Sequence, residues 1–294
     1  PRQRHRGHRS PLSAFCLVRP PGHHATVDGF DPVAGGCGFC LFNAVAVGAA
    51  HAIAVHGLRV AIVDFDVHHG NGTEAVVRNV RPSSTLEQFP CGAGTITLKS
   101  SSFKPWLTAN DGDKIFFGSI HGFGAETDED GEPTGSFYPG SGGPTTDQDV
   151  KDAPGVRNSP MPLRTSSEKW RRAFLDKILV PLAAFAPDLV IVSAGFDAHA
   201  NDPLEAGGLH EHDFAWMTAE LVAVAEASAG GRLVSVLEGG YQVNGGPLSS
   251  LAIATAAHVR TLMDPALVGS SWSAADGPAR FEATVAAERA WTEE

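Results

Sequence analysis

The segment Val60-Ala-Ile-Val-Asp-Phe-Asp-Val-His-His-Gly-Asn-Gly72 carries the strongest structural signal in the chain. An unbroken apolar run of this length is typical of a parallel strand that is buried on both faces. Because strand side chains alternate between faces, Asp64, Asp66 and His68 leave the end of the strand on one side. Two carboxylates and an imidazole at the carboxyl end of a parallel strand indicate a metal site. The plainer alternative is a polar glycine turn after a strand.

Runs of strand length and runs of helix length alternate on both sides of this segment. The predicted strands are 12–18, 58–64, 114–120, 189–193 and 232–237, and the predicted helices are 43–56, 73–79, 165–185, 214–229 and 248–263. This alternation predicts an α/β fold: a mainly parallel sheet with helices on both faces, three layers in a single domain. Residues 80–113 and 121–165 are expected to be irregular insertions, the second with an acidic tip at 126–132.

Composition narrows the function classes. The 294 residues are enough for one large α/β domain, here expected at 11–265 between a basic tail at 1–10 and an extension at 266–294. A net charge of −11 argues against a nucleic-acid binder and permits a basic peptide substrate, although acidity also serves solubility alone. No run approaches the roughly 20 apolar residues of a membrane span. The four cysteines are too few for a disulfide scaffold, and the Cys37-Gly-Phe-Cys40 spacing alone is weak support for a redox or zinc motif.

Polar clusters follow four of the predicted strands. In chain order they are His23-His24, the group Asp64, Asp66 and His68, then Asp197, and finally Tyr241. Each cluster alone has an ordinary explanation as a cap, a turn or a surface group. The carboxyl ends of parallel strands meet at one edge of the sheet, so all four clusters together predict a single site. His199, His210 and His212 are expected to be loop or surface residues rather than ligands.

Six ordered motifs carry a resemblance to a known family. They are Arg19-Pro-Pro-Gly-His-His-Ala25, Gly38-Phe-Cys-Leu-Phe-Asn43, Asp64-Phe-Asp-Val-His-His-Gly-Asn-Gly-Thr73, Phe137-Tyr-Pro-Gly-Ser-Gly142, Ser193-Ala-Gly-Phe-Asp197 and Leu237-Glu-Gly-Gly-Tyr241. In this wording and order the chain resembles the zinc-dependent histone deacetylases and their acetylpolyamine-hydrolysing relatives. Asn71 and the Leu-Glu-Gly-Gly-Tyr wording are closer to the class II branch than to class I. The resemblance implies an arginase-like fold.

The resemblance also implies how a metal would be held. Asp66, His68 and Asp197 would bind one zinc ion and leave an open position for water. Two carboxylates with one imidazole also suit iron(II). A structural potassium ion is implied as well, held by oxygens of Asp64, Asp66 and His68 together with Ser119 and Ile120.

Catalytic roles follow from the same resemblance. His24 would be the general base, with His23 beside it as an electrostatic and orienting group. Asp64 would pair with His23, and Asn71 with His24. A carboxylate favours a charged imidazole and a neutral amide does not, so His24 should be the ring free to accept a proton. Tyr241 would hydrogen-bond the oxyanion of the tetrahedral intermediate.

Four further residues are expected to bind the substrate. Phe39 and Tyr138 match the aromatic pair that lines the acyl-lysine channel, and Gly38 offers a backbone acceptor. Leu204 stands where polyamine-selective relatives carry an acid, so acyl-lysine is favoured over acetylpolyamines. The resemblance thus implies an acetylated protein substrate such as a histone tail, with a role in chromatin regulation, no direct nucleic-acid or membrane contact, and nuclear or cytoplasmic residence. A corepressor partner is left open.

The match also has gaps. Family domains have a long segment before the Pro-Pro-Gly-His-His motif, and only 19 residues precede Pro20 here. We therefore expect an N-terminally truncated catalytic domain in which no residue can be assigned to the family's substrate-clamping acid. Two alternatives stay open: an acetylpolyamine amidohydrolase, or a catalytically weak scaffold that lacks the mouth loop.

Overall fold

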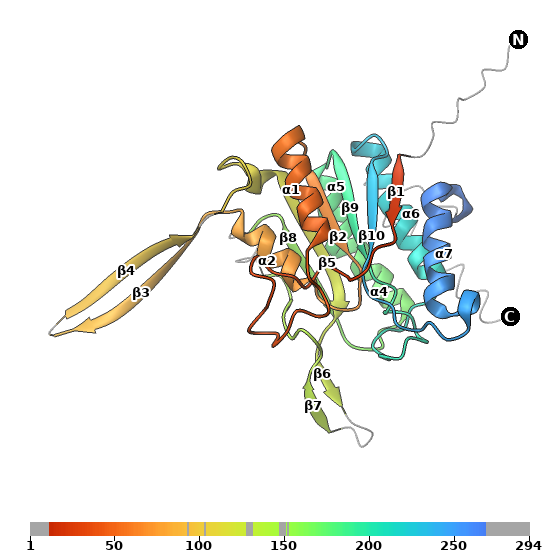
Figure 1. The fold of residues 1–294 in the computed structure, drawn as a ribbon, viewed down its shortest axis with the longest axis horizontal. Coiled ribbons are helices and arrows are strands. Elements are labelled where there is room, and N and C mark those ends of the chain that lie inside the picture. Colours follow the sequence, from red (N-terminus) through yellow and green to blue (C-terminus); the bar gives the residue numbers. More distant parts are fainter. Residues whose placement is uncertain are drawn as a thin grey trace, which may run out of the picture.

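A computed structural model describes residues 12–92, 94–102, 104–127, 132–146, 151 and 153–268. Its central sheet has the strand order β1-β10-β9-β2-β5-β8, and every neighbouring pair is parallel. The strands are β1 (Ser13–Cys16), β2 (Val60–Asp64), β5 (Ile115–Gly122), β8 (Val156–Met161), β9 (Leu189–Ala194) and β10 (Leu233–Leu237). The predicted α/β architecture in a single domain is confirmed (Figure 1).

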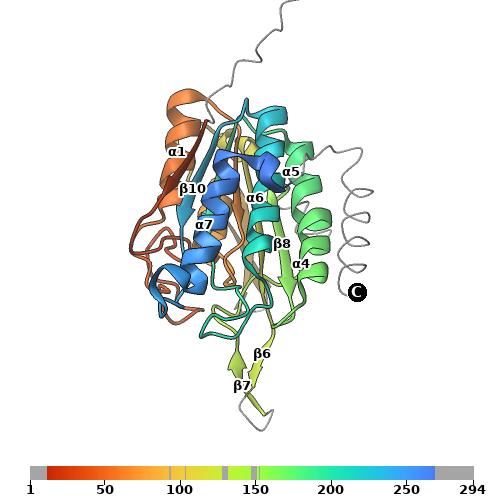
Figure 2. The same cartoon turned by 90° about the vertical axis from the view of Figure 1, so that its right-hand side faces the viewer.

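Helices cover both faces of the sheet. They are α1 (Ala44–His56), α2 (Asn71–Asn79), α4 (Ser167–Ala173), α5 (Val180–Phe185), α6 (Glu211–Ser228) and α7 (Ser250–Met263), with a π-helical segment Phe174–Leu179 between α4 and α5 and 3₁₀ turns at Asp111–Lys114, Gly246–Leu248 and Pro265–Val268. Figure 2 shows α1 on one side of the sheet and α4 to α7 on the other. Within the described ranges, no helix is long and apolar enough to cross a membrane.

Strand β2 lies in the middle of the sheet and is buried along its whole length. Its alternate residues enter two separate cores, as the period of two requires. Val60 and Ile62 pack with apolar residues of α1 and α2. Ala61 and Val63 pack with the core that α4, α6 and α7 share. Burial on both faces explains why the segment is apolar up to Asp64.

The two insertions are more ordered than the sequence predicts. Residues 80–113 contain a hairpin of β3 (Ser83–Cys91) and β4 (Gly94–Ser102), and residues 121–165 contain β6 (Ala125–Thr127), β7 (Pro133–Ser136) and the sheet strand β8. Both hairpins extend away from the body (Figure 1). The expectation of irregular loops was therefore wrong for β8, an edge strand whose polar residues and Pro160 hide its pattern. The centre of the acidic tip, 128–131, lies outside the described residues.

The predicted helix boundaries agree with the structure for α1 and differ from it for α4. Asn43 caps α1 by accepting from the Ala46 N–H, and Gly57 ends it in the left-handed conformation with φ of 69°. The helix predicted from residue 165 begins later, at Ser167, because Ser166 is the N-cap and the Thr165 hydroxyl donates to the Pro162 carbonyl. The predicted tail 1–10 and most of the extension 266–294 lie outside the described residues.

Candidate metal centre and active site

The four predicted polar clusters share one edge of the sheet. They follow β1, β2, β9 and β10, which are consecutive in the strand order. Strand β2 brings Asp64 into register with Ser193 of β9 and with Ser119 of β5. The parallel arrangement therefore places the loops that carry the candidate residues beside one another.

Asp66, His68 and Asp197 form the most compact donor group at this edge. One ligand atom of each lies within 4.8 Å of the others, and all three residues are buried. The His68 Nδ1 atom is 2.9 Å from Asp66 Oδ1 and 3.1 Å from Asp197 Oδ2. One ring nitrogen thus faces two carboxylate oxygens with at most one proton to share.

The remaining contacts of these carboxylates are those of oriented metal ligands. Backbone N–H groups of Gly239 and Val67 donate to Asp66 Oδ2 at 2.7 Å and to Asp197 Oδ1 at 2.9 Å. These bonds fix the carboxylates from outside the donor group. The Asp197 Oδ2 atom is buried, and its contact with His68 Nδ1 at 3.1 Å lacks the geometry of a hydrogen bond. A divalent cation would satisfy that oxygen and the surplus negative charge, so the residues fit a metal ion.

Two glycines make the close approach possible. A Cβ atom on Gly195 would lie 2.0 Å from Asp66 Oδ2, and one on Gly239 would lie 2.1 Å from Asp197 Oδ2. Neither contact is compatible with any larger residue. The glycines in the Ser-Ala-Gly-Phe-Asp and Leu-Glu-Gly-Gly-Tyr motifs therefore provide the space in which the two carboxylates lie.

The pKa values of the donor group reflect burial and crowding of like charges. Burial, followed by the Asp66 charge, raises the pKa of Asp197 to about 7. Burial opposes protonation of His68, but the hydrogen bonds and charges of Asp197 and Asp66 raise its pKa to about 10. A proton is thus held among three groups, and binding of a metal ion would displace it to solvent.

His23 and His24 lie side by side above this group, with ring centroids 4.0 Å apart. His23 Nδ1 is 2.9 Å from Asp64 Oδ2, and His24 Nδ1 is 2.7 Å from Asn71 Oδ1. These are the two pairings that the resemblance implied. Strand β2 and the start of α2 provide both partners, which is why the Asp64 to Thr73 motif is continuous in sequence.

The two rings have opposite electrostatic surroundings. Burial lowers the pKa of His23, but the charges of Asp64, Asp66 and Glu238 outweigh it and raise that pKa well above its ordinary value. For His24, burial and then the neighbouring His23 and His68 hold the pKa well below its ordinary value. His23 is therefore the charged ring of the pair and His24 the neutral one.

Glu238 is a buried residue whose role the sequence did not reveal. Its Oε2 accepts from the backbone N–H groups of Gly22 at 2.6 Å and His23 at 3.1 Å, and its Oε1 accepts from the Ser193 hydroxyl at 3.1 Å. Glu238 thus joins the loops after β1 and β10 to strand β9. The only available signal was an acid within an otherwise glycine-rich motif.

Tyr241 is held by a second buried acid that sequence reasoning missed. Asp202 Oδ2 accepts from the backbone N–H groups of Tyr241 at 2.8 Å and Gln242 at 3.3 Å. Burial and then the charges of Asp66 and Asp197 raise the pKa of the Tyr241 phenol. The hydroxyl therefore stays protonated and can donate a hydrogen bond.

Two of the predicted substrate residues, Tyr138 and Gly38, lie against His24. Tyr138 lies edge-on to His24 with centroids 5.0 Å apart, and Gly38 lies directly against the His24 ring, where a Cβ would be 2.2 Å from Cδ2. Phe39 is 74% exposed, and Leu204 is 43% exposed. Both can therefore contact a molecule that approaches from solvent. Their roles in substrate binding stay predictions.

The cysteine pair beside these residues does not look reactive. Cys37 and Cys40 are both free, and Cys40 is buried. The Cys40 Sγ accepts from the His24 N–H at 3.4 Å, and burial raises the pKa of its thiol to about 11. A redox cysteine needs a lowered pKa, so the structure argues against the redox alternative.

The implied potassium residues also lie together. Asp64 and Ser119 are register partners, and Ser119 and Ile120 are fully buried. The Ser119 hydroxyl is 2.9 Å from His121 Nδ1. This arrangement is compatible with an oxygen-lined cation site, which stays a prediction.

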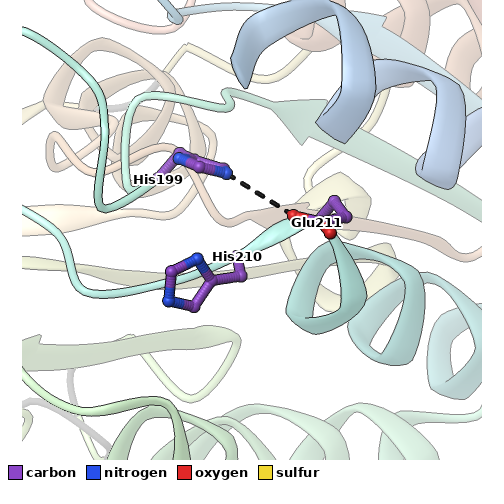
Figure 3. A group of neighbouring side chains, drawn as sticks. All are labelled: His199, His210 and Glu211. Atoms are coloured by element: carbon purple, nitrogen blue, oxygen red, sulfur yellow. Dashed lines mark ion pairs between the residues drawn. The ribbon is translucent and has the colours of Figure 1, made fainter. Parts of the chain in front are cut away.

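A second group of potential ligands consists of His199, His210 and Glu211 (Figure 3). His199 lies in a loop, as expected, although it is only 1% exposed, whereas His210 and Glu211 are exposed. The His199 Nδ1 accepts from the Asn201 N–H at 3.0 Å, so in the neutral ring Nε2 carries the proton. That nitrogen points at Glu211, 3.7 Å away, as a donor and not as a free ligand.

Comparison with known proteins identifies the family. Residues 8–259 match the family model described as histone deacetylase domain. The chain is 34% identical to type-2 histone deacetylase 2 of Dictyostelium discoideum over 260 residues, which is 85% of this chain and 12% of that protein. It is 34% identical to the histone deacetylase-like amidohydrolase of Pseudomonas aeruginosa over 244 residues, 82% of this chain and 51% of the relative.

A solved structure supports the same family assignment. The crystal structure of the HDA15 HD domain matches 85% of this chain and 55% of its own, with a TM-score of 0.58 and 29% identity. The chain spans about half of the length of the Pseudomonas relative and much less of the Dictyostelium protein. The family match covers the strands and all the loops described above. The chain therefore belongs to the histone deacetylase domain family.

Proposed function

We propose that the chain is a zinc-dependent amidohydrolase that removes acetyl or another acyl group from lysine side chains of proteins such as histones. One observation carries this proposal: a buried Asp66–His68–Asp197 donor group lies next to a histidine pair with one charged and one neutral ring. A bound divalent ion would polarise the amide carbonyl and acidify a water molecule. Iron(II) would suit the same donors.

Three side chains of the protein would transfer protons or stabilise charge during the reaction. Neutral His24 would accept a proton from the attacking water and later deliver it to the leaving lysine amine. His23, charged through its contact with Asp64, would stabilise negative charge on the reacting centre. Tyr241, kept protonated by its surroundings, would donate a hydrogen bond to the developing oxyanion.

Acyl-lysine is the substrate class that the surrounding residues favour. Tyr138 and Phe39 offer aromatic surface beside His24, which suits the apolar stem of a lysine. Leu204 is neutral, so it offers no counter-charge to a polyamine. The acidic composition suits a basic peptide, and a role in chromatin regulation and a class II character are part of the same proposal. We also propose nuclear or cytoplasmic residence, because the family resemblance implies it.

The test is turnover of an acetyl-lysine peptide by the purified protein, measured together with its metal content. We expect one zinc or iron per chain, turnover that a chelator abolishes, and recovery when zinc is added back. Acetylspermidine should react much more slowly than the peptide. Turnover that persists in fully metal-free protein would contradict the proposal, and metal binding without turnover would favour the scaffold alternative. Faster reaction of acetylspermidine would favour the polyamine alternative.

A further inference from the structure

Hydrogen bonds connect three side chains in a row: His24, Asn71 and, farthest from the donor group, Asp31. His24 Nδ1 is 2.7 Å from Asn71 Oδ1, and Asn71 Nδ2 donates to Asp31 Oδ2 at 2.5 Å. Asn71 is 6% exposed and His24 is 4% exposed, so both are shielded from water. Asp31 lies in the glycine-rich loop between the His-His motif and α1, and no motif in the sequence distinguishes it from the other loop acids.

The direction of each hydrogen bond follows from Asp31. An ionised carboxylate only accepts, so the amide of Asn71 must turn its NH₂ group toward Asp31. Its carbonyl oxygen then faces His24, and a carbonyl also only accepts. His24 Nδ1 must therefore carry the ring proton, which leaves Nε2 with a free lone pair. That lone pair is what a general base needs.

Without the carboxylate the orientation would be ambiguous. A terminal amide can rotate by half a turn and exchange its oxygen for its nitrogen with little change in shape. The rotated Asn71 would donate to His24 Nδ1, and the ring proton would then move to Nε2. In that state His24 could not accept a proton. The paired His23 has no such ambiguity, because Asp64 contacts it directly.

The loop is built to hold Asp31 in place. Its backbone exchanges two hydrogen bonds with Gly36, at 3.1 Å and 3.2 Å. Its Oδ1 accepts from the N–H groups of Val33 at 2.8 Å and Ala34 at 3.3 Å, which leaves Oδ2 for Asn71. Partial burial acts against the charge, but the hydrogen bonds from Asn71, Val33 and Ala34 outweigh it and hold the pKa of Asp31 below its ordinary value. The carboxylate is thus ionised and oriented.

We propose that Asp31 is a positioning residue that fixes the amide orientation of Asn71 and, through it, the Nδ1–H tautomer of His24. Its catalytic meaning rests on the deacetylase function proposed above, but the tautomer itself does not. Beside His24 the chain has the amide of Asn71 and not a carboxylate. Asp31 orients that amide, so that His24 Nδ1 still donates its hydrogen bond to an oxygen, as it would to a carboxylate. The ring stays neutral and keeps a defined lone pair.

The experiment is ¹⁵N NMR of histidine-labelled protein near neutral pH, which distinguishes a protonated ring nitrogen from an unprotonated one. The His24 signals are those missing from His24→Gln. In the wild type we expect protonated Nδ1 and bare Nε2. In Asp31→Ala we expect a mixture of both tautomers and at least about a twofold loss of kcat, because the competent fraction falls to about half or less when the bias is removed.

Two further variants make the result specific. Asp28→Asn removes a carboxylate from the same loop and should leave the His24 signals and turnover unchanged. The exchange Asp31→Asn with Asn71→Asp places a carboxylate directly on His24 and should restore protonated Nδ1. An unaltered His24 spectrum in Asp31→Ala would overturn the proposal, as would an equal change in Asp28→Asn. The spectra decide this even if the protein proves to have no deacetylase activity.

Discussion

The loop that follows β9 contributes to two groups of potential metal ligands, Asp66–His68–Asp197 and His199–His210–Glu211. The ligand atoms of each group lie within 4.8 Å of one another, so distance alone does not separate the two groups. Their surroundings do. The first group is wholly buried, and backbone N–H groups fix both of its carboxylates. In the second, two of three members are exposed, and the buried ring is held in the tautomer that points an N–H at the carboxylate.

The comparison shows that the contacts behind the ligands matter as much as the ligands. A metal-binding imidazole normally gives its second N–H to an acceptor, so that the nitrogen facing the metal has a free lone pair. His199 has the reverse arrangement, because its second nitrogen receives an N–H from Asn201. We interpret the second group as a structural cluster at the start of α6 (Figure 3).

The largest expected effect separates the two groups directly. Asp197→Ala removes one of three ligands and should reduce metal affinity by more than the 10–100-fold typical of outer contacts, with loss of turnover. Glu211→Gln is the matched change in the second group and should leave metal content and turnover unaltered. Elemental analysis of both variants after dialysis measures the difference. Equal metal loss in the two variants would remove the distinction between the groups.

Much of the first group could be predicted because its signals are local. Asp64, Asp66 and His68 follow a single strand at the spacing of alternate residues, and a buried parallel strand is easily recognised from its apolar run. Asp197 and Tyr241 were placed at the same edge by the rule that parallel strands end together. The fold was predictable to the same extent, since five of the six sheet strands have apolar runs and β8 does not.

The second effect concerns how the start of α6 is held. Asp213 is fully buried and forms an ion pair with Arg171, whose Nε is 2.7 Å from the carboxylate. The carboxylate also accepts a hydrogen bond from the His210 backbone N–H at 2.8 Å. Breaking a buried ion pair by removing one partner leaves an uncompensated charge, so Asp213→Ala should lower the free energy of unfolding by about 3–5 kcal/mol. Urea denaturation of metal-matched samples measures it. The double change Arg171→Met with Asp213→Leu should cost less than Asp213→Ala alone, and a larger cost would argue against the uncompensated charge as the cause.

The third effect returns to the first group. Tyr241→Phe removes the hydroxyl proposed to bind the oxyanion while keeping the ring, so kcat should fall by roughly 10²–10³ with little change in KM. Metal content and unfolding free energy should match the wild type, because the hydroxyl is not a ligand in the donor group. Steady-state kinetics with an acetyl-lysine peptide provides the measurement. A kcat within a few-fold of wild type would show that Tyr241 does not stabilise the transition state.

Residues that act at long range in sequence were not predictable. Asp31, Asp202 and Glu238 bind backbone or amide groups of loops from other strands, and such contacts depend on how loops pack after the sheet has formed. An acid in a loop has many ordinary explanations, and nothing in its neighbours indicates its partner. The distinction between His199 and a true ligand was likewise set by one backbone N–H two residues away, which no composition or spacing encodes.

The smallest effect tests a third kind of buried imidazole, in which both nitrogens are satisfied. The Thr218 hydroxyl donates to the Phe214 carbonyl, so it accepts from His258 Nδ1 at 2.7 Å, while Ser235 donates to Nε2 at 2.8 Å. Burial lowers the pKa of His258 from 6.5 to about 3. Below about pH 6.5 the unfolded chain therefore binds a proton that the folded protein does not, and stability is lost as the pH falls.

The contribution of His258 should appear as a difference between wild type and variant in how the unfolding free energy changes with pH. The advantage of the wild type over His258→Gln in unfolding free energy should be constant above about pH 7 and shrink by up to about 1.4 kcal/mol per pH unit below about 6.5. Urea denaturation of both proteins between about pH 7.5 and 5 measures it, with metal content held equal. His212→Gln is the control, because it makes the same change at an exposed imidazole. A constant difference across this range would mean that His258 is protonated in the fold, and that two satisfied nitrogens do not suffice to keep a buried ring neutral.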